Sequence, residues 1–186
     1  MKKIILSSVL IVSLFVARAQ ITQGIGGSLF LVNSDATGSQ TSWGITDYFR
    51  YHLSSNISVG IPFSFGISGN YNSRGQEGSG ISFTLQVPIA ADYNFGLGSK
   101  EGEDGHFGAY GGVGFGYFGT TYSNTTTDIY GNSNGSTGTV SATGPYLHGG
   151  LRFDVSEHIL DLGLSYHKGL NDPKASIIGI SLLYGL

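Results

Sequence analysis

The stretch NISVGIPFSFGIS, residues 56–68, decides the fold of this chain. Every second residue from Ile57 to Ile67 is large and apolar, and strict alternation over this length is the period of a β-strand with two unlike faces. The other face holds only Ser, Gly and Pro and carries no charge. The water-facing side of a soluble sheet usually carries charged or long polar side chains. The pattern therefore predicts an apolar face that points outward and a small face that points into a narrow interior.

The composition of the whole chain favours a membrane environment. Of its 186 residues, 31 are Gly and 12% are aromatic. Only 11% are charged, against roughly 25% in average soluble proteins. So few charges would leave a soluble surface poorly covered. No apolar run after the N-terminal segment approaches the roughly 20 residues that a transmembrane helix needs. A membrane-spanning form of this chain must therefore be built from β-strands.

The first residues, MKKIILSSVLIVSLFVARAQ, are typical of a secretory signal peptide. Lys2 and Lys3 precede an apolar run, and Ala17-Arg18-Ala19 has the small-x-small pattern of a cleavage site. We expect residues 1–19 to be removed and residues 20–186 to form the mature domain. Loss of three of the nine basic residues leaves six against twelve acidic ones, a net charge of −6. A chain with this charge is not expected to bind nucleic acid through a basic patch.

Alternating segments recur along the mature chain, separated by stretches rich in Gly, Asn, Ser and Asp. We predict eight strands, over residues 23–32, 42–53, 56–68, 81–95, 107–118, 146–155, 159–167 and 176–186. The connections mostly alternate between long and short, and residues 119–144 are expected to form the longest, a solvated loop. Outer-membrane barrels alternate in this way. The sequence thus predicts an all-β fold, a single eight-stranded up-and-down antiparallel transmembrane β-barrel.

Aromatic residues cluster at one predicted rim of the barrel. Tyr93 and Phe95 close one strand, Phe107 opens the next, and Tyr184 nearly ends the last. Aromatic girdles of this kind lie at membrane interfaces. We therefore expect these four side chains at the periplasmic interface.

Strand parity also turns ionisable side chains inward, namely Arg50, His52, Asp92, His148, Arg152, Asp154, Asp161 and His167. The interior of an eight-stranded barrel is just wide enough to be filled by side chains, so inward charges must pair across it. We predict a structural network of salt bridges inside the barrel, formed by Arg50, Asp92, Arg152, Asp154 and Asp161.

No motif predicts a catalytic, cofactor or metal site. Residues 114–119, GFGYFG, match the dinucleotide pattern G-x-G-x-x-G, but no helical pattern follows them. The five histidines lack zinc-motif spacing, and the absence of Cys excludes thiolate ligands and nucleophiles. A lipid-modifying barrel enzyme would need its nucleophile toward lipid, whereas parity turns Ser165 and His167 inside. We expect a protein without enzymatic activity.

Several segments together resemble the family of eight-stranded outer-membrane β-barrel domains, of the OmpA/OmpX-like kind. They are LQVPIAADYNFG (85–96), GHFGAYGGVGFGYF (105–118), GLRFDVSEHILDLGLSYHKGLND (150–172) and the apolar end IGISLLYGL (178–186). The resemblance implies an integral protein of the outer membrane of a Gram-negative-type bacterium, with a structural or surface-interaction role. It also implies contact with outer-membrane lipid and recognition by the outer-membrane assembly machinery through the C-terminal strand. Such barrels typically end in Phe, whereas this chain ends in Leu186.

Two alternatives stay open at this level. A soluble secreted lipocalin-like barrel that binds an apolar ligand would show the same alternation with its faces exchanged, although the shortage of charge favours lipid. A small pore is the other, but eight strands leave no aqueous lumen unless the interior rearranges. The sequence names no extracellular partner.

Overall fold

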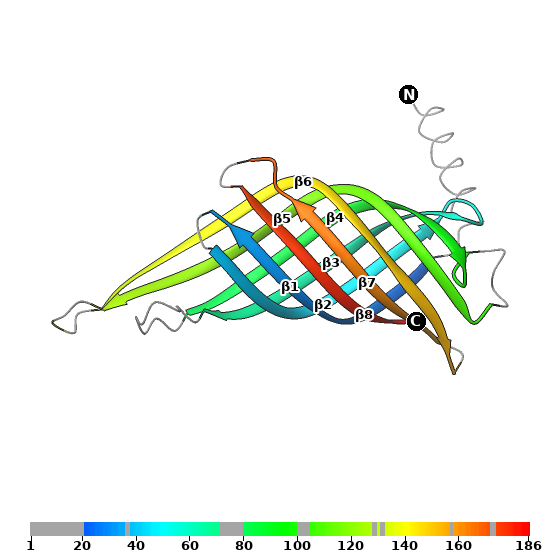
Figure 1. The fold of residues 1–186 in the computed structure, drawn as a ribbon, viewed down its shortest axis with the longest axis horizontal. Coiled ribbons are helices and arrows are strands. Elements are labelled where there is room, and N and C mark those ends of the chain that lie inside the picture. Colours follow the sequence, from blue (N-terminus) through cyan, green and yellow to red (C-terminus); the bar gives the residue numbers. More distant parts are fainter. Residues whose placement is uncertain are drawn as a thin grey trace, which may run out of the picture.

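A computed structural model shows one closed barrel in which neighbouring strands are antiparallel (Figure 1). The structure describes residues 21–35, 38–70, 80–99, 105–127, 130, 133–156, 158–171 and 174–186. Eight strands follow one another around the barrel in chain order, and the first pairs with the last to close it. The predicted fold class is confirmed. Within the described residues, no helix is long and apolar enough to cross a membrane.

The strands are β1 (Ile21–Ser34), β2 (Gly38–His52), β3 (Ile57–Asn70), β4 (Gly80–Gly96), β5 (Phe107–Thr127), β6 (Ser133–Val155), β7 (His158–Lys168) and β8 (Ala175–Gly185). Most extend only a few residues beyond their predicted bounds. The two ends of the barrel are distinct. The C-terminus lies with the β2–β3, β4–β5 and β6–β7 connections at what we call the terminal end.

The prediction of a loop over residues 119–144 is wrong. β5 continues to Thr127 and β6 begins at Ser133, and the two strands pair without interruption along this length. The last rung between β5 and β4 is at Thr120, so the two strands project past their neighbours as a two-stranded ribbon (Figure 1). We call residues 121–127 and 133–139 the ribbon. Its abundant Thr residues are β-branched and suit a strand, which the loop-like Ser, Asn and Gly content obscured.

The barrel wall has its apolar side chains outside and its small side chains inside. In β3 the inward Ser58, Ser64 and Ser68 are at most 4% exposed. The outward large side chains of the same strand are between 41% and 47% exposed, namely Ile57, Ile61, Phe63, Phe65 and Ile67. A lipocalin-like barrel would need the opposite arrangement, so that alternative is not favoured.

Aromatic side chains gather at the terminal end, as predicted. Tyr93, Phe95 and Phe107 are each about half exposed, at 48%, 57% and 54%. Tyr93 packs on Phe95 with ring centroids 4.6 Å apart, and Phe107 meets Phe153 edge-on at 5.5 Å. Tyr184, at 42% exposed, lies at the same end. Half-exposed rings at one rim suit a membrane interface.

The interior is divided into two halves of different chemistry. Toward the ribbon it is filled by an apolar cluster of Phe30, Val32, Phe118, Val140, Ala142, Ala175 and Ile177. Toward the terminal end it holds the charged residues described below. Between them lie hydroxyl groups joined in series, with 2.6 Å between Ser28 and Thr46 and 2.8 Å between Thr46 and Ser64. The side chains on the inward face are therefore not uniformly small. In the ribbon-end halves of β1 and β8, consecutive residues are apolar, so large apolar side chains point both inward and outward.

Proline interrupts one seam of the wall. β3 and β4 pair up to Gly60 and Ala90 and again from Ser64 and Gln86, and the unpaired interval contains Pro62 and Pro88. Proline has no backbone N–H and cannot donate to a ladder. On the neighbouring strand Gly116 lies against Pro88, and a Cβ at that position would overlap the Pro88 backbone.

The inverted wall predicts that a charge on its outer face is costly in proportion to its depth in the membrane. Ile61→Arg, in the middle of the outward row of β3, should lower the free energy of unfolding by about 2–4 kcal/mol, and Ile57→Arg, at the terminal-end rim, by only about 0–1 kcal/mol. Chemical unfolding in phospholipid vesicles measures both values. Equal, small losses at both positions would mean that this face does not contact hydrocarbon.

Candidate functional site

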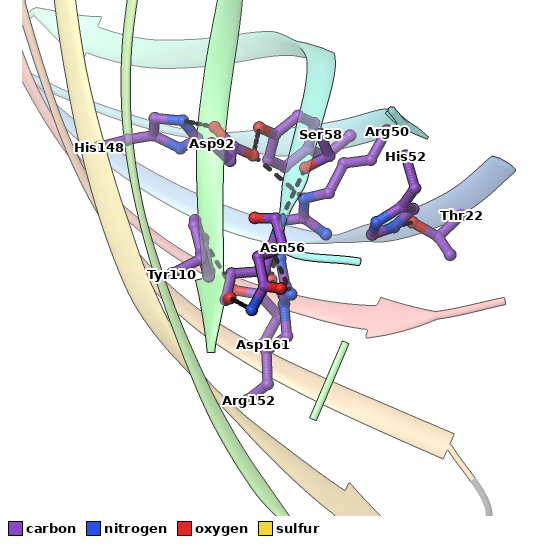
Figure 2. Close-up of polar contacts among 12 residues, drawn as sticks. Thr22, Arg50, His52, Asn56, Ser58, Asp92, Tyr110, His148, Arg152 and Asp161 are labelled. Carbon is purple, nitrogen blue, oxygen red and sulfur yellow. Dashed lines mark hydrogen bonds and ion pairs between the residues drawn. The ribbon is translucent and has the colours of Figure 1, made fainter. Parts of the chain in front are cut away.

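Four of the five residues predicted to form the interior network meet inside the barrel at the terminal end (Figure 2). Arg50 comes from β2, Asp92 from β4, Arg152 from β6 and Asp161 from β7. They are 6%, 2%, 2% and 3% exposed. Alternation brings each of them inward, and closure of the barrel brings strands distant in sequence face to face.

Asp161 is the centre of this network. Its Oδ2 accepts a hydrogen bond of 2.8 Å from Nη2 of Arg50 and one of 3.4 Å from Nε of Arg152. Its Oδ1 accepts a hydrogen bond of 2.9 Å from the Tyr110 hydroxyl. One carboxylate thus holds two guanidinium groups, and buried charges of this kind are tolerated only when they are paired and hydrogen-bonded.

Asp92 forms a second centre beside the first. Its Oδ1 lies 2.7 Å from Nε2 of His148, and its Oδ2 accepts a hydrogen bond from the Tyr48 hydroxyl. The same Oδ2 is 3.7 Å from Nε of Arg50, which links the two carboxylates. Arg50 also stacks on the Tyr48 ring, 3.7 Å from its centroid. This cation–π contact adds to the ion pairs in a desolvated site.

Arg152 is fixed by a third set of contacts. Its Nη1 donates to Oδ1 of Asn94 at 2.9 Å, and its guanidinium lies 4.5 Å from the centroid of the Tyr110 ring. Gly98, in the β4–β5 connection, has a φ of +86°, and any side chain there would overlap the Arg152 guanidinium. The connection therefore folds close over Arg152 because a glycine stands at this position.

The fifth predicted member, Asp154, does not join the network. Its carboxylate contacts Nδ1 of His106 at 3.1 Å, and the two side chains are 33% and 89% exposed. Asp154 has the expected parity but lies at the end of β6, where the strand has passed the rim of the interior. Alternation gives the direction of a side chain and not its height along the barrel, which explains the error.

Sequence reasoning placed His148 inward without assigning it a partner, and it missed Tyr48, Tyr110 and Asn94. Tyr48 shares the inward parity of Arg50 on β2, and Asn94 shares that of Asp92 on β4, so their signal was present, whereas β5 has no charged residue to mark the parity of Tyr110. The predicted network contains only charged side chains. The side chains of Tyr48, Tyr110 and Asn94 supply hydrogen-bond partners to Asp92, Asp161 and Arg152, respectively.

The carboxylates of the network are already engaged in hydrogen bonds. Both carboxylates already accept hydrogen bonds from cations, hydroxyls or a histidine. His167 is fully buried inside, hydrogen-bonded to Gln86 at 3.0 Å, and Ser165 lies on the same inner face. Residues 114–119 lie within β5. No group of three or more potential metal ligands gathers among the described side chains.

Cavities inside the barrel are small. One of about 180 Å³ lies at the terminal end, lined by Arg50, Arg152 and His52 among others. Further in, between Tyr48, Tyr110 and their neighbours, about 20 Å³ is left, room for roughly one water molecule. The apolar cluster follows toward the ribbon. The described side chains leave no wide passage along the axis.

Comparison with known proteins agrees with this geometry. Residues 4–185 match the model of the outer membrane protein beta-barrel domain. The chain belongs to this family. It is an integral outer-membrane barrel, and the ribbon marks its extracellular end, since the turns of such barrels are periplasmic and their longer extensions external. No curated protein matches the chain.

Solved outer-membrane barrels share the fold at low sequence identity. Neisserial surface protein A (NspA) is 14% identical with a TM-score of 0.56, and the match covers 90% of this chain and 96% of that one. Ail, the attachment invasion locus protein of Yersinia pestis, solved with the heparin analogue sucrose octasulfate, is 18% identical with a TM-score of 0.54, covering 90% and 99%. OprG of Pseudomonas aeruginosa is 12% identical with a TM-score of 0.50, covering 89% and 95%.

At the extracellular end the structure has an open groove of about 390 Å³ between the β1–β2 and β7–β8 connections. Lys168 and Lys174 line it together with Asp35. Both lysines are exposed, and they are the two lysines of the described part of the chain. The groove therefore concentrates the positive charge that this negatively charged protein exposes on its described surface.

The filled interior predicts that the barrel does not conduct ions steadily. In planar bilayers the unsubstituted protein should show no sustained current, because side chains fill an eight-stranded barrel. Tyr48→Ala with Tyr110→Ala removes the two rings beside the inner void and should permit small, noisy currents. A stable open conductance of the unsubstituted protein would contradict the closed interior.

Proposed function

We propose that this barrel acts at the cell surface by binding an external molecule, and that it is neither an enzyme nor a general pore. The observation that carries the proposal is the contrast between the two parts of the molecule. The interior is filled by the Asp161 and Asp92 contacts and by the apolar cluster. The extracellular end is elaborated by the ribbon and by the lysine-lined groove.

The chemistry of the groove suits an anionic partner. Lys168 and Lys174 stand on opposite sides of the β7–β8 connection, and the groove is open rather than enclosed. Two ammonium groups with only Asp35 as a described carboxylate beside them favour sulfate, phosphate or carboxylate groups. The relation to Ail, whose structure holds a heparin analogue, motivates heparin as the probe.

The ribbon offers a second contact surface beside the groove. Its described residues include no Lys, Arg, Glu or Pro, the residues that usually protect a free strand edge. An unprotected edge that projects from the membrane can pair with an extended segment of another molecule. We assign the ribbon a supporting role, because the two lysines of the groove predict the chemistry of the partner more specifically than a free strand edge does.

Export and assembly complete the proposal. We infer that residues 1–19 are cleaved as a signal peptide, and that the outer-membrane assembly machinery recognises β8, whose outward row ends in Tyr184, together with Leu186 directly after the strand. Lipid of the outer membrane surrounds the apolar band.

The proposal predicts that cells displaying this protein adhere to heparin-coated surfaces. Lys168→Ala with Lys174→Ala should reduce adhesion several-fold, and raised salt should reduce adhesion of the unsubstituted protein because it screens exposed charges. His106→Ala, at the periplasmic end, is the matched control and should adhere normally. Adhesion equal to that of cells without the protein, or adhesion insensitive to the lysine substitutions, would contradict the proposal.

A further inference from the structure

Among the described residues, the lipid-facing wall carries one carboxylate in its middle. Asp47 of β2 has outward parity, since its neighbours Thr46 and Tyr48 are 5% and 2% exposed and point inside. Its outward neighbours are apolar, namely Ile45 and Phe49 along β2, Ile25 across on β1 and Phe63 across on β3. Asp47 itself is half-buried. The alternation that identifies the inward charges could have identified this outward one.

Asp47 lies deep in the apolar band rather than at its rim. Its partner Phe63 is a central member of the outward row of β3, with three outward apolar residues before it and two after it. Along β2, Trp43 and Ile45 lie on the extracellular side of Asp47, and Phe49 and Tyr51 on the periplasmic side. A carboxylate at this depth is expensive to keep in contact with hydrocarbon.

One side chain of this chain partly compensates the charge. Nε2 of Gln23, on the outer face of β1, donates to both oxygens of Asp47 at 2.9 and 3.1 Å. No cation joins them on the described wall, because Arg50 and Arg152 lie inside and Lys168 and Lys174 lie at the extracellular rim. A single amide leaves most of the acceptor capacity of a carboxylate unused. The two oxygens of one carboxylate lie close enough together to share one hydrogen of Nε2, which leaves the second hydrogen and the amide oxygen of Gln23 for another partner.

The surface beside this pair is recessed. Gly27 of β1 faces outward opposite Ile45, and a Cβ added there would meet no atom within 4 Å. Small residues at a lipid-facing position let a second barrel approach closely, and polar side chains in hydrocarbon stabilise association through hydrogen bonds across the interface. Gly27 and the Gln23–Asp47 pair form one patch on β1 and β2.

We propose that this patch is the contact surface between two copies of the chain within the membrane. The pair carries both a donor and acceptors, so it is complementary to itself. Around a two-fold axis, the free Gln23 hydrogen of each copy can donate to Asp47 of the other, and each bond is formed twice. Two-fold contacts of this self-complementary kind are the commonest in homo-oligomers. The second copy, like the first, has no lipid-facing cation among its described residues. Its Gln23 amide is therefore the group that can donate to Asp47.

Cysteine crosslinking tests the position of the contact. The chain has no Cys, so single substitutions can be read without background. Gly27→Cys, beside the proposed axis, should form a disulfide-linked dimer in phospholipid vesicles. Val113→Cys, on β5 and 63% exposed, faces away from the patch and is the matched control. Crosslinking of Gly27→Cys no greater than that of Val113→Cys, or its linkage to a different protein, would overturn the proposal.

Sedimentation of the folded protein in density-matched detergent tests the chemistry. Asp47→Leu with Gln23→Leu should raise the dissociation constant of the dimer by about tenfold or more, since two symmetric hydrogen bonds are lost. Phe115→Leu, an apolar change on another part of the wall, should leave it unchanged. Folding of each variant is checked by its heat-modifiable gel mobility. If the double variant does not fold, the cysteine comparison decides alone, and self-association of the double variant as strong as that of the unsubstituted chain would overturn the proposal.

Discussion

The sharing of the Asp161 carboxylate by Arg50 and Arg152 is the constraint on which the rest of the barrel depends. These groups come from β7, β2 and β6, so they meet only when the wall closes. If one of the three charged groups were missing from the interior, its partners would remain buried without full charge compensation, which is strongly destabilising. The network therefore links closure of the barrel to electrostatic balance at its centre, and Tyr110 donates a further hydrogen bond to Asp161 while Asn94 accepts one from Arg152.

Because the interior is filled, the barrel can interact with other molecules only through its outer surfaces. Because the polar network, the hydroxyl groups and the apolar cluster already fill the interior, the remaining large apolar side chains face outward, and only lipid can cover them. Specific interactions with other molecules can then occur at surfaces outside the lipid, and at the few polar groups within the lipid-facing band. The groove at Lys168 and Lys174 belongs to the first kind, and the Gln23–Asp47 pair belongs to the second.

Alternation predicts most of this architecture because a period of two directly encodes which side of the wall a residue faces. It correctly identifies β3, the inverted wall and the inward direction of Arg50, Asp92, Arg152 and Asp161. It does not encode height, so Asp154 was assigned to the interior although it lies at the rim. Composition also does not distinguish a strand from a loop where pairing with a neighbouring strand determines the conformation, as it does in the ribbon. The same parity places Asp47 on the outer face of β2, where the apolar outward pattern alone predicts no charge.

A double-mutant cycle between Arg50 and Asp161 tests the central role of the shared carboxylate most directly. The free energies of unfolding of Arg50→Met, Asp161→Leu and the double variant are measured in phospholipid vesicles against the unsubstituted barrel. Arg50→Met leaves Asp161 with only one of its two guanidinium partners, Asp161→Leu leaves both guanidinium groups without this carboxylate, and each single variant should lose about 3–5 kcal/mol. The double variant should be less destabilised than the sum by at least about 2 kcal/mol. Strictly additive losses would contradict the account, since they would mean that the two side chains stabilise the barrel independently.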